Sequence, residues 1–293
     1  MRLLPIIETL VNFSDVRWRR HATDRDPWLH APGDPLFFHH IPKTGGTSLI
    51  AAIGEIVPPE LAMTERGNLS AEFVDRLVGR GLRRGQFIHG HPLVGAAARL
   101  RGRSNIVTLL REPCEQLISN YLYQREDWRS PHHELSLQLR FREFVLARPR
   151  FAIFQTASLH FGIAENAEDP DATTKDYIAM VPSVLAYLDE MALVGVLSEP
   201  AWFMRSLAKL MRWPRTPRFP HRRKARISAK QRQRLREQCA DLMDQTTLSP
   251  LFAAEYAVYR HAQALAEKQH MSSPAYSERN FQFRYPREKD ILG

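Results

Sequence analysis

The sequence predicts an α/β fold: a P-loop-like, three-layer arrangement in which helices flank a central parallel sheet. Short apolar or β-branched runs alternate with helical patterns along the 293-residue chain, which is typical of a parallel sheet covered by helices. The runs are Leu36–Ile41, Gln86–His89, Ile106–Leu110 and Ala192–Leu197. Polar residues and glycines follow three of these runs, at the strand ends where ligands bind in open parallel sheets.

Prolines and capping residues mark the helices in the first half of the chain. Thr47–Val57 has a helical pattern that ends before two prolines. Ser70 is a good N-cap for the apolar residues that follow it at helical spacing. Pro113–Gln124 is amphipathic, and its first residue suits the first turn of a helix. Further helices are expected over Phe141–Leu146, Phe151–Leu159, Tyr177–Leu188, Pro200–Met211, Ser228–Met243 and Leu251–Glu267.

The expected domain organisation is one domain with two terminal extensions. Residues 1–34 are expected to form an N-terminal arm, 35–268 the domain and 269–293 a loose tail. The polar stretches Arg125–Arg140 and Asn166–Thr174 are expected to be loops that shape substrate specificity.

Composition places the chain among ordinary globular proteins and predicts a cytoplasmic location. Hydrophobic residues make up 44% and charged residues 25%. No apolar run approaches the roughly 18 residues needed to cross a bilayer. Glu8 interrupts the apolar N-terminus, which makes a poor signal peptide. The two cysteines, Cys114 and Cys239, suggest no disulfide framework and are expected to be reduced. We therefore expect the cytoplasm of a bacterium, with the periphery of the inner membrane as an alternative.

The charge balance favours a polyanionic partner. With 41 Lys and Arg against 32 Asp and Glu, the net charge is +9. The excess is concentrated in Arg215–Arg236, which contains no acidic residue. Anionic glycans, phosphorylated cofactors and nucleic acids all suit such a segment, and so does an ordinary solvated surface.

The segment between the first strand and the first helix predicts an anion-binding loop. Its residues are Lys43, Thr44, Gly45, Gly46, Thr47 and Ser48. Glycines let the backbone approach a phosphate closely, and the N–H groups at a helix N-terminus point toward it. The lysine precedes the glycines, whereas a Walker A loop places it after them. The usual nucleotide-triphosphatase interpretation therefore fails, and an ordinary strand-to-helix turn is the structural alternative.

Two later segments complete a pattern with that loop. One is His89-Gly90-His91, at the end of the second strand, and the other is Arg111-Glu112-Pro113 followed by Ser119. Together with Ile41-Pro42-Lys43-Thr44, they resemble the motifs of carbohydrate sulfotransferases related to heparan-sulfate 2-O-sulfotransferase and their bacterial relatives. The resemblance is strong over residues 36–123, where the three segments follow the family order.

The resemblance implies a cofactor, a substrate class and roles for particular residues. The cofactor is 3′-phosphoadenosine-5′-phosphosulfate (PAPS), the sulfuryl donor, with no metal. Its 5′-phosphosulfate would bind the loop Lys43–Ser48, and its 3′-phosphate would bind Arg111 and Ser119. Basic residues of a C-terminal loop, here Arg223 and Lys224, would help to hold it. The acceptor would be a saccharide or glycoconjugate hydroxyl. Gln116 departs from the family, which usually has Arg there, so no ligand contact is assigned to it.

The residue chemistry fits sulfuryl transfer. Lys43 can stabilise the negative charge that grows on the oxygen between sulfur and phosphorus. An imidazole can remove the proton of an acceptor hydroxyl, and His91 is the expected base, with His89 as a substrate-binding or supporting residue. Because alternate residues of a strand share a face, both rings are expected to face one cleft. A metal pair is the competing interpretation, but two histidines do not supply the usual three or four ligands.

Two other functions fit parts of the sequence. A nucleotide-dependent kinase would also use a phosphate loop, but the lysine order is wrong and no strand ends in an evident magnesium-binding aspartate. A nucleic-acid or polyanion-binding module could be built on the basic segment 215–236. That module would bind with a steep salt dependence and would need neither Lys43 nor His91.

Overall fold

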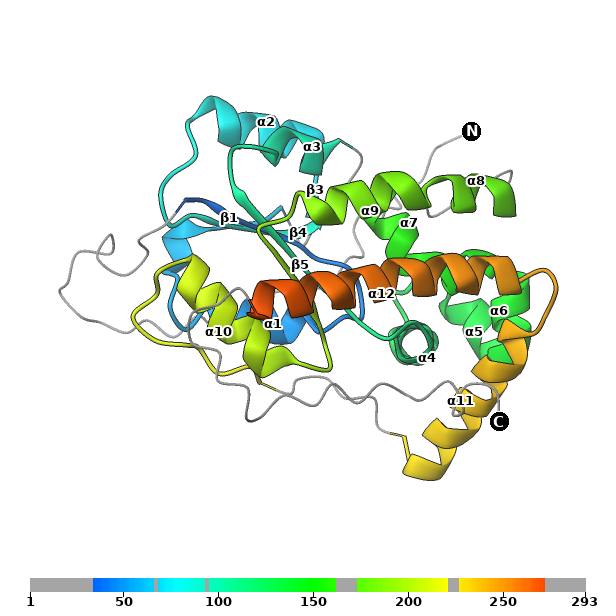
Figure 1. The fold of residues 1–293 in the computed structure, drawn as a ribbon. Helices are drawn as coiled ribbons and strands as arrows, with labels where there is room; N and C mark the ends of the chain where they lie inside the picture. Colours follow the sequence, from blue (N-terminus) through cyan, green and yellow to red (C-terminus); the bar gives the residue numbers. More distant parts are fainter. Residues whose placement is uncertain (1–33, 66–67, 93–94, 162–172, 221–226, 272–293) are drawn as a thin grey trace, which may run out of the picture.

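The fold is α/β, with a central parallel sheet flanked by helices, as the computed structural model shows (Figure 1). The structure describes residues 34–65, 68–92, 95–161, 173–220 and 227–271. The sheet has six strands in the order β2-β4-β1-β5-β6, with β3 beside β4, and every strand pair is parallel. The strands are β1 (Leu36–His39), β2 (Ala62–Met63), β3 (Asn68–Leu69), β4 (Phe87–Pro92), β5 (Asn105–Leu110) and β6 (Leu193–Val196).

The described helices form layers on both sides of the sheet (Figure 1). In chain order they are α1 (Gly46–Ile53), η3 (Pro59–Leu61), α2 (Ala71–Gly79), α3 (Ala96–Leu100), α4 (Pro113–Glu126), α5 (His133–Gln138), α6 (Phe141–Ala147), η4 (Pro149–Ile153), α7 (Phe154–Phe161), α8 (Thr174–Ala179), α9 (Val181–Asp189), α10 (Pro200–Leu210), α11 (Ala229–Met243) and α12 (Ser249–Met271). No described helix is long and apolar enough to be a candidate membrane span.

The strand register decides which side chains meet on each face of the sheet. Phe37 pairs with Ile88 and Phe38 with His89, so alternate residues point to opposite faces. Phe38 packs with α1 and α10 in one core, whereas Phe37 packs with α2, α3, α9 and α12 in another. A third core joins α4, α6, η4, α11 and α12 beside the sheet. The strands are therefore buried on both faces, as the apolar runs predict.

Several elements differ from the sequence prediction. Tyr177–Leu188 is divided between α8 and α9, because Pro182 has no N–H to donate to the carbonyl group one turn earlier. The expected helix over Phe151–Leu159 begins as the 3-10 helix η4. The expected loop Arg125–Arg140 contains α5. Strands β2 and β3 have two residues each, too few to give a readable alternation.

The cysteines also differ from the expectation that they are reduced. The structure pairs Cys114 of α4 with Cys239 of α11 as a disulfide, with their Cα atoms 6.2 Å apart. Both side chains are buried in the same core. No local pattern indicates this pair, because the cysteines lie 125 positions apart.

The predicted arm over residues 1–34 lies almost entirely outside the described residues, as does most of the predicted tail over 269–293. The predicted loop Asn166–Thr174 lies largely outside them too. The last described helix, α12, runs to Met271, slightly past the expected domain end at residue 268.

Candidate functional site

The loop between β1 and α1 requires both of its glycines. Gly45 has φ +94°, in the left-handed region that favours glycine. A Cβ atom on Gly46 would lie 1.9 Å from Nε2 of His40, so the imidazole occupies the space that a side chain would need. Close packing of the His40 ring therefore explains the second glycine, and the backbone conformation explains the first.

The loop is tightly closed by its own hydrogen bonds. The buried Thr44 hydroxyl donates to the carbonyl oxygen of Ile41 at 2.9 Å. The N–H groups of Ser48 and Leu49 donate to the Gly45 carbonyl at 3.0 and 3.1 Å, which closes the first turn of α1. Lys43 has φ +68°, an uncommon conformation for a residue other than glycine and one that is often found at functional sites. The Thr44 hydroxyl thus serves the loop rather than a ligand, and Ser48 is buried.

The structure brings Lys43 and Arg111 together. A guanidinium nitrogen of Arg111 donates to the Lys43 carbonyl oxygen at 3.3 Å. The Lys43 ammonium group lies over the ring of Tyr123 on α4, with Nζ 4.2 Å from the ring centroid. Gln116, also on α4, donates to the Pro42 carbonyl at 3.3 Å. The anion-binding loop and α4 are therefore in direct contact.

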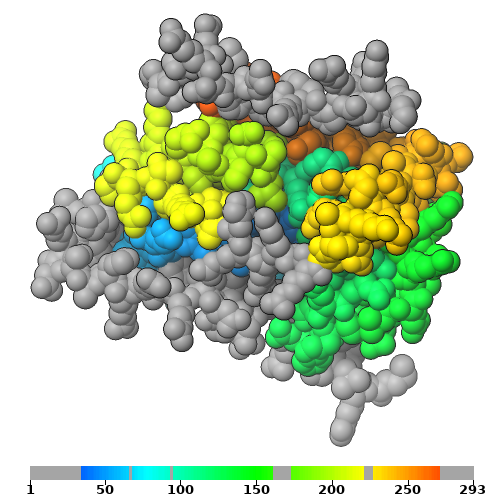
Figure 2. Space-filling view, turned by 90° about the horizontal axis from the view of Figure 1, so that it is seen from below, coloured from blue at the N-terminus to red at the C-terminus, as the bar shows by residue number. Residues whose placement is uncertain are grey.

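Three arginines converge on one carboxylate beside this loop. Glu115 accepts hydrogen bonds from Arg111 at 3.1 Å, Arg232 at 2.8 Å and Arg236 at 2.6 Å. Burial opposes ionisation of Glu115, but the hydrogen bond from Arg236 and the surrounding positive charges lower its pKa overall. Arg232 and Arg236 come from α11, which contacts α4 and α6 and lies on the molecular surface (Figure 2). The three arginines outnumber Glu115 and the nearby Glu112, which leaves a positively charged site.

His91 is held as a specific neutral tautomer. Its Nδ1 lies 2.8 Å from the His40 carbonyl oxygen, which can only accept, so Nδ1 carries the proton and Nε2 the lone pair. Its ring stacks on the His40 ring, with the centroids 4.2 Å apart. Burial lowers the pKa of His91 to about 4; the hydrogen bond to His40 raises it, and the charge of Lys43 lowers it further. The imidazole is therefore uncharged at neutral pH.

His89 lies two residues before His91 on β4, so the two side chains are on the same face of the strand. Its ring stacks on that of Phe87, with the centroids 4.7 Å apart, and 2% of the residue is exposed. Burial, followed by the charge of His91, lowers its pKa to about 4. This depth favours the supporting role over substrate contact. His40, which the sequence analysis left without a role, contacts both His91 and the space over Gly46.

The remaining predicted residues have different outcomes. Ser119 is half-buried on α4, one helical turn beyond Glu115 and on the same face of the helix. Thr47 is half-buried in the first turn of α1. Arg223 and Lys224 lie outside the described residues. Among the residues that the structure describes, no three His, Cys, Asp or Glu side chains form a group that could hold a metal ion.

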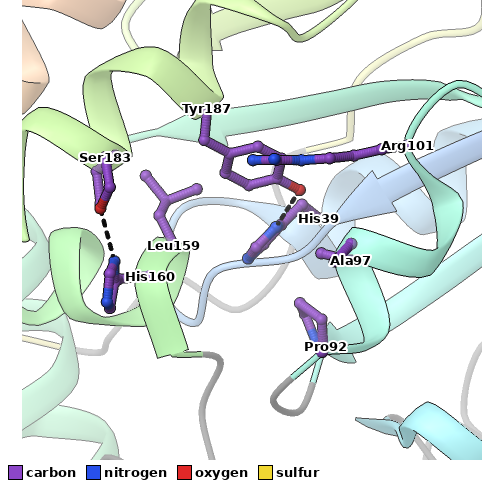
Figure 3. A pocket seen from close by; sticks show the side chains of 11 residues that line it. His39, Pro92, Ala97, Arg101, Leu159, His160, Ser183 and Tyr187 are labelled. Carbon is purple, nitrogen blue, oxygen red and sulfur yellow. Dashed lines mark hydrogen bonds between the residues drawn. The ribbon is translucent and has the colours of Figure 1, made fainter.

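A cavity of about 250 Å³ lies at the carboxyl ends of β1 and β4, and none of the predicted site residues lines it (Figure 3). It includes His39 and Pro92, whose side chains alternate with those of His40 and His91 along their strands. Nδ1 of His39 accepts from the Tyr187 hydroxyl at 3.1 Å, because its Nε2 faces the Ser158 carbonyl. The polar groups at its centre thus bond to one another, and the cavity lies apart from the Lys43 loop.

The comparisons with known proteins find similarity among solved structures. No family model matches the chain. No curated protein matches it either. Among solved structures, the chain is similar to mouse sulfotransferase SULT7A1 complexed with PAP, with 15% identity, a TM-score of 0.28, and coverage of 80% of this chain and 91% of that chain. A likeness at this level carries no argument about function, so the functional argument depends on the site itself.

Proposed function

We propose that this protein is a PAPS-dependent sulfotransferase that transfers the sulfuryl group to a hydroxyl of a saccharide or glycoconjugate. The contact between Arg111 and the Lys43 carbonyl is the main support. The resemblance assigns these two residues to opposite ends of one nucleotide, so they have to lie within its length. Packing supports adding His91 to this site, because its ring stacks on that of His40, which fills the space over Gly46 in the loop.

The loop and Lys43 would act on the leaving group. Sulfuryl transfer breaks the bond between sulfur and the bridging oxygen, whose electrons remain on the 5′-phosphate of the departing 3′,5′-diphosphate. Backbone N–H groups at the start of the eight-residue helix α1 and the Lys43 ammonium group would stabilise that charge. Lys43 rests on the Tyr123 ring in this structure and would turn toward the nucleotide. By analogy with phosphoryl transfer, positioning of the reactants and electrostatic stabilisation would therefore supply most of the rate enhancement.

His91 would act as the base. Its Nε2 lone pair would take the proton of the acceptor hydroxyl while that oxygen forms its bond to sulfur in line with the leaving group. The low pKa keeps the ring in its basic form, although a group with such a pKa is a weak base. The negative charges of a bound nucleotide would raise the pKa of His91 and strengthen the base.

The arginine cluster would hold the 3′-phosphate. Arg111 and the Ser119 hydroxyl are the contacts that the resemblance implies, and guanidinium groups match phosphate oxygens in geometry and charge. Arg232 and Arg236 lie within reach through Glu115 and would add positive potential there. Arg223 and Lys224 remain cofactor-binding candidates on the resemblance alone.

The wider predictions belong to the same proposal. Residues 35–268 would form the sulfotransferase domain, with 1–34 as an arm and 269–293 as a tail. The net charge of +9 favours an anionic acceptor. The cytoplasmic location, and the alternative at the inner membrane, remain predictions from composition.

A thermal-shift and calorimetry panel tests the function. We expect PAP (adenosine 3′,5′-diphosphate) and PAPS to raise the unfolding free energy by about 2.7 kcal/mol at one hundred times Kd, and ATP and ADP to have little effect. Equal stabilisation by ATP would favour a kinase. Salt-sensitive binding of duplex DNA that survives Lys43→Ala would favour the polyanion-binding module.

Arg111→Ala tests the 3′-phosphate assignment. Losing charge-assisted hydrogen bonds worth about 1.5–3 kcal/mol should weaken PAP binding by roughly tenfold to a hundredfold. Binding of adenosine 5′-monophosphate should change much less. The control is Arg99→Ala on α3, whose guanidinium pairs with Asp75 on the surface. Equal losses for both nucleotides would show that Arg111 does not recognise the 3′-phosphate.

A further inference from the structure

The backbone of Arg111 is held from both sides by one buried amide. The N–H of Arg111 donates to Oε1 of Gln155 at 2.8 Å, and Nε2 of Gln155 donates to the carbonyl oxygen of Arg111 at 2.9 Å. Gln155 is 1% exposed and belongs to α7. Strand β5 ends at Leu110, so the Gln155 side chain supplies the two hydrogen bonds that a neighbouring strand would give to the next residue.

A buried carboxylate on α12 fixes Gln155 in turn. Oε1 of Glu255 accepts from the backbone N–H and the side-chain Nε2 of Gln155, at 2.9 and 3.2 Å. Its Oε2 accepts from the N–H and hydroxyl of Thr156, at 3.0 and 2.5 Å. Glu255 therefore caps the N-terminus of α7 from a distant helix and leaves the Gln155 amide one orientation. All four groups can donate to the carboxyl oxygens, and these hydrogen bonds oppose the burial that raises the pKa of Glu255.

Tyr256, which follows Glu255 on α12, binds Glu112, which follows Arg111 in the chain. The hydroxyl of Tyr256 donates to a carboxylate oxygen of Glu112. Glu112 caps α4 by accepting from the N–H groups of Cys114 and Glu115, at 3.1 and 2.7 Å. Two consecutive residues of α12 thus fix two consecutive residues at the junction of β5 and α4.

We propose that Gln155, oriented by Glu255, is a positioning residue that aims the Arg111 guanidinium into the nucleotide site and thereby sets the preference for a 3′-phosphorylated nucleotide. This inference rests on the proposed function. With its backbone fixed on both sides, Arg111 reaches Lys43 of the loop and Glu115 of α4 with one guanidinium group. A backbone that rotates would move that group off the phosphate while leaving its charge nearby.

A matched control separates positioning from stability. Oε1 of Gln269 on α12 accepts from the N–H of Val194 in β6 at 3.1 Å. This is a second contact between a glutamine amide and a strand of the same sheet, far along the chain from Arg111. Gln155→Met and Gln269→Met each remove a glutamine amide that accepts from a backbone N–H, and we expect both to lower the melting temperature.

The experiment measures Kd for PAP and for adenosine 5′-monophosphate by calorimetry in the full-length protein. We expect the wild-type protein to prefer PAP and Gln155→Met to reduce that preference about tenfold, the equivalent of one or two hydrogen bonds. Gln269→Met should keep the preference within about twofold, a change too small for a lost charged contact. An unchanged preference in Gln155→Met would overturn the positioning role.

A second variant tests the pH dependence of the PAP preference, which would not change if Gln155 had only a structural role. Gln155→Glu keeps the oxygen that faces the Arg111 N–H but loses the donor to the Arg111 carbonyl, and it places two carboxylates side by side. Protonation restores the donor, so its PAP preference relative to wild type should rise as pH falls from 8 to 5.5. A ratio that stays constant with pH would contradict the proposal.

The outcomes separate the inference from the function on which it rests. A wild-type protein that does not prefer PAP would overturn the proposed function and the inference with it. A wild-type protein that prefers PAP, with Gln155→Met sharing the preference, would overturn the inference alone. If Gln155→Met does not fold, Glu255→Gln carries the same test, because it turns one of the acceptors facing Gln155 and Thr156 into a donor.

Discussion

At the scale of single residues, hydrogen bonds distinguish His91, the proposed base, from His39. His91 donates from Nδ1 to the His40 carbonyl, which leaves Nε2 with the lone pair of a base. His39 has the opposite arrangement, because both of its nitrogens are engaged within the protein. Burial lowers the pKa of both rings to about 4, so the pKa values alone could not distinguish them.

His91→Gln should therefore abolish chemistry and spare binding. General-base catalysis contributes about 10²–10⁴-fold, so sulfate transfer should fall by that factor, while Kd for PAP changes little. Turnover assays and calorimetry on the same preparation check both. His261→Gln is the control, since that side chain pairs with Asp189 on the surface. Weakened PAP binding in His91→Gln would make the residue structural.

The sequence revealed the residues that belong to local motifs and missed those that arrive from elsewhere in the chain. Lys43 and Arg111 follow strands β1 and β5, and His91 lies near the end of β4, so the parallel sheet brings the three residues to one edge. Gln155 and Glu255 lie far from them in the sequence and carry no local pattern. Their role depends on how α7 and α12 pack, which no spacing rule encodes.

At the scale of elements, α11 is attached to α4 at the arginine cluster. The Cys114–Cys239 pair and the contacts of Arg232 and Arg236 with Glu115 all join these two helices. The sequence predicted a helix over Ser228–Met243, and in the structure the Ser228 hydroxyl caps α11 by accepting from the N–H of Gln231. The sequence could not predict where α11 packs, because more than one face of a basic, half-exposed helix could pack against the domain.

Reduction of the cysteine pair should therefore loosen this attachment. Removing a native disulfide costs about 2–5 kcal/mol of unfolding free energy. We expect dithiothreitol to lower the melting temperature of the wild-type protein and to leave a Cys114→Ser/Cys239→Ser variant unchanged. Thiol alkylation under denaturing conditions counts the unpaired cysteines. Two alkylated thiols in the protein purified without reductant would show that the pair does not form.

At the scale of the whole molecule, four buried histidines gather where β1 and β4 end. His39, His40, His89 and His91 are all at most 7% exposed. The sequence placed them at two separate predicted strands, but it could not show that β4 pairs directly with β1, since the strand order depends on crossovers that carry no local signal. The cluster makes the stability of the molecule depend on pH.

Acid should unfold this protein over a defined range. Burial lowers the folded-state pKa of His39, His89 and His91 from 6.5 to about 4, so the unfolded chain binds more protons between these values. Stability is thus constant above about pH 7 and falls as pH drops from 6.5 toward 4. Since one pKa unit corresponds to about 1.4 kcal/mol, protonation of each ring can lower the unfolding free energy by a few kcal/mol.

Urea unfolding at pH 8, 6.5, 5.5 and 4.5 measures how the unfolding free energy depends on pH. His39→Gln should flatten it, whereas equal unfolding free energies for the wild-type protein at pH 8 and 4.5 would contradict neutral buried rings.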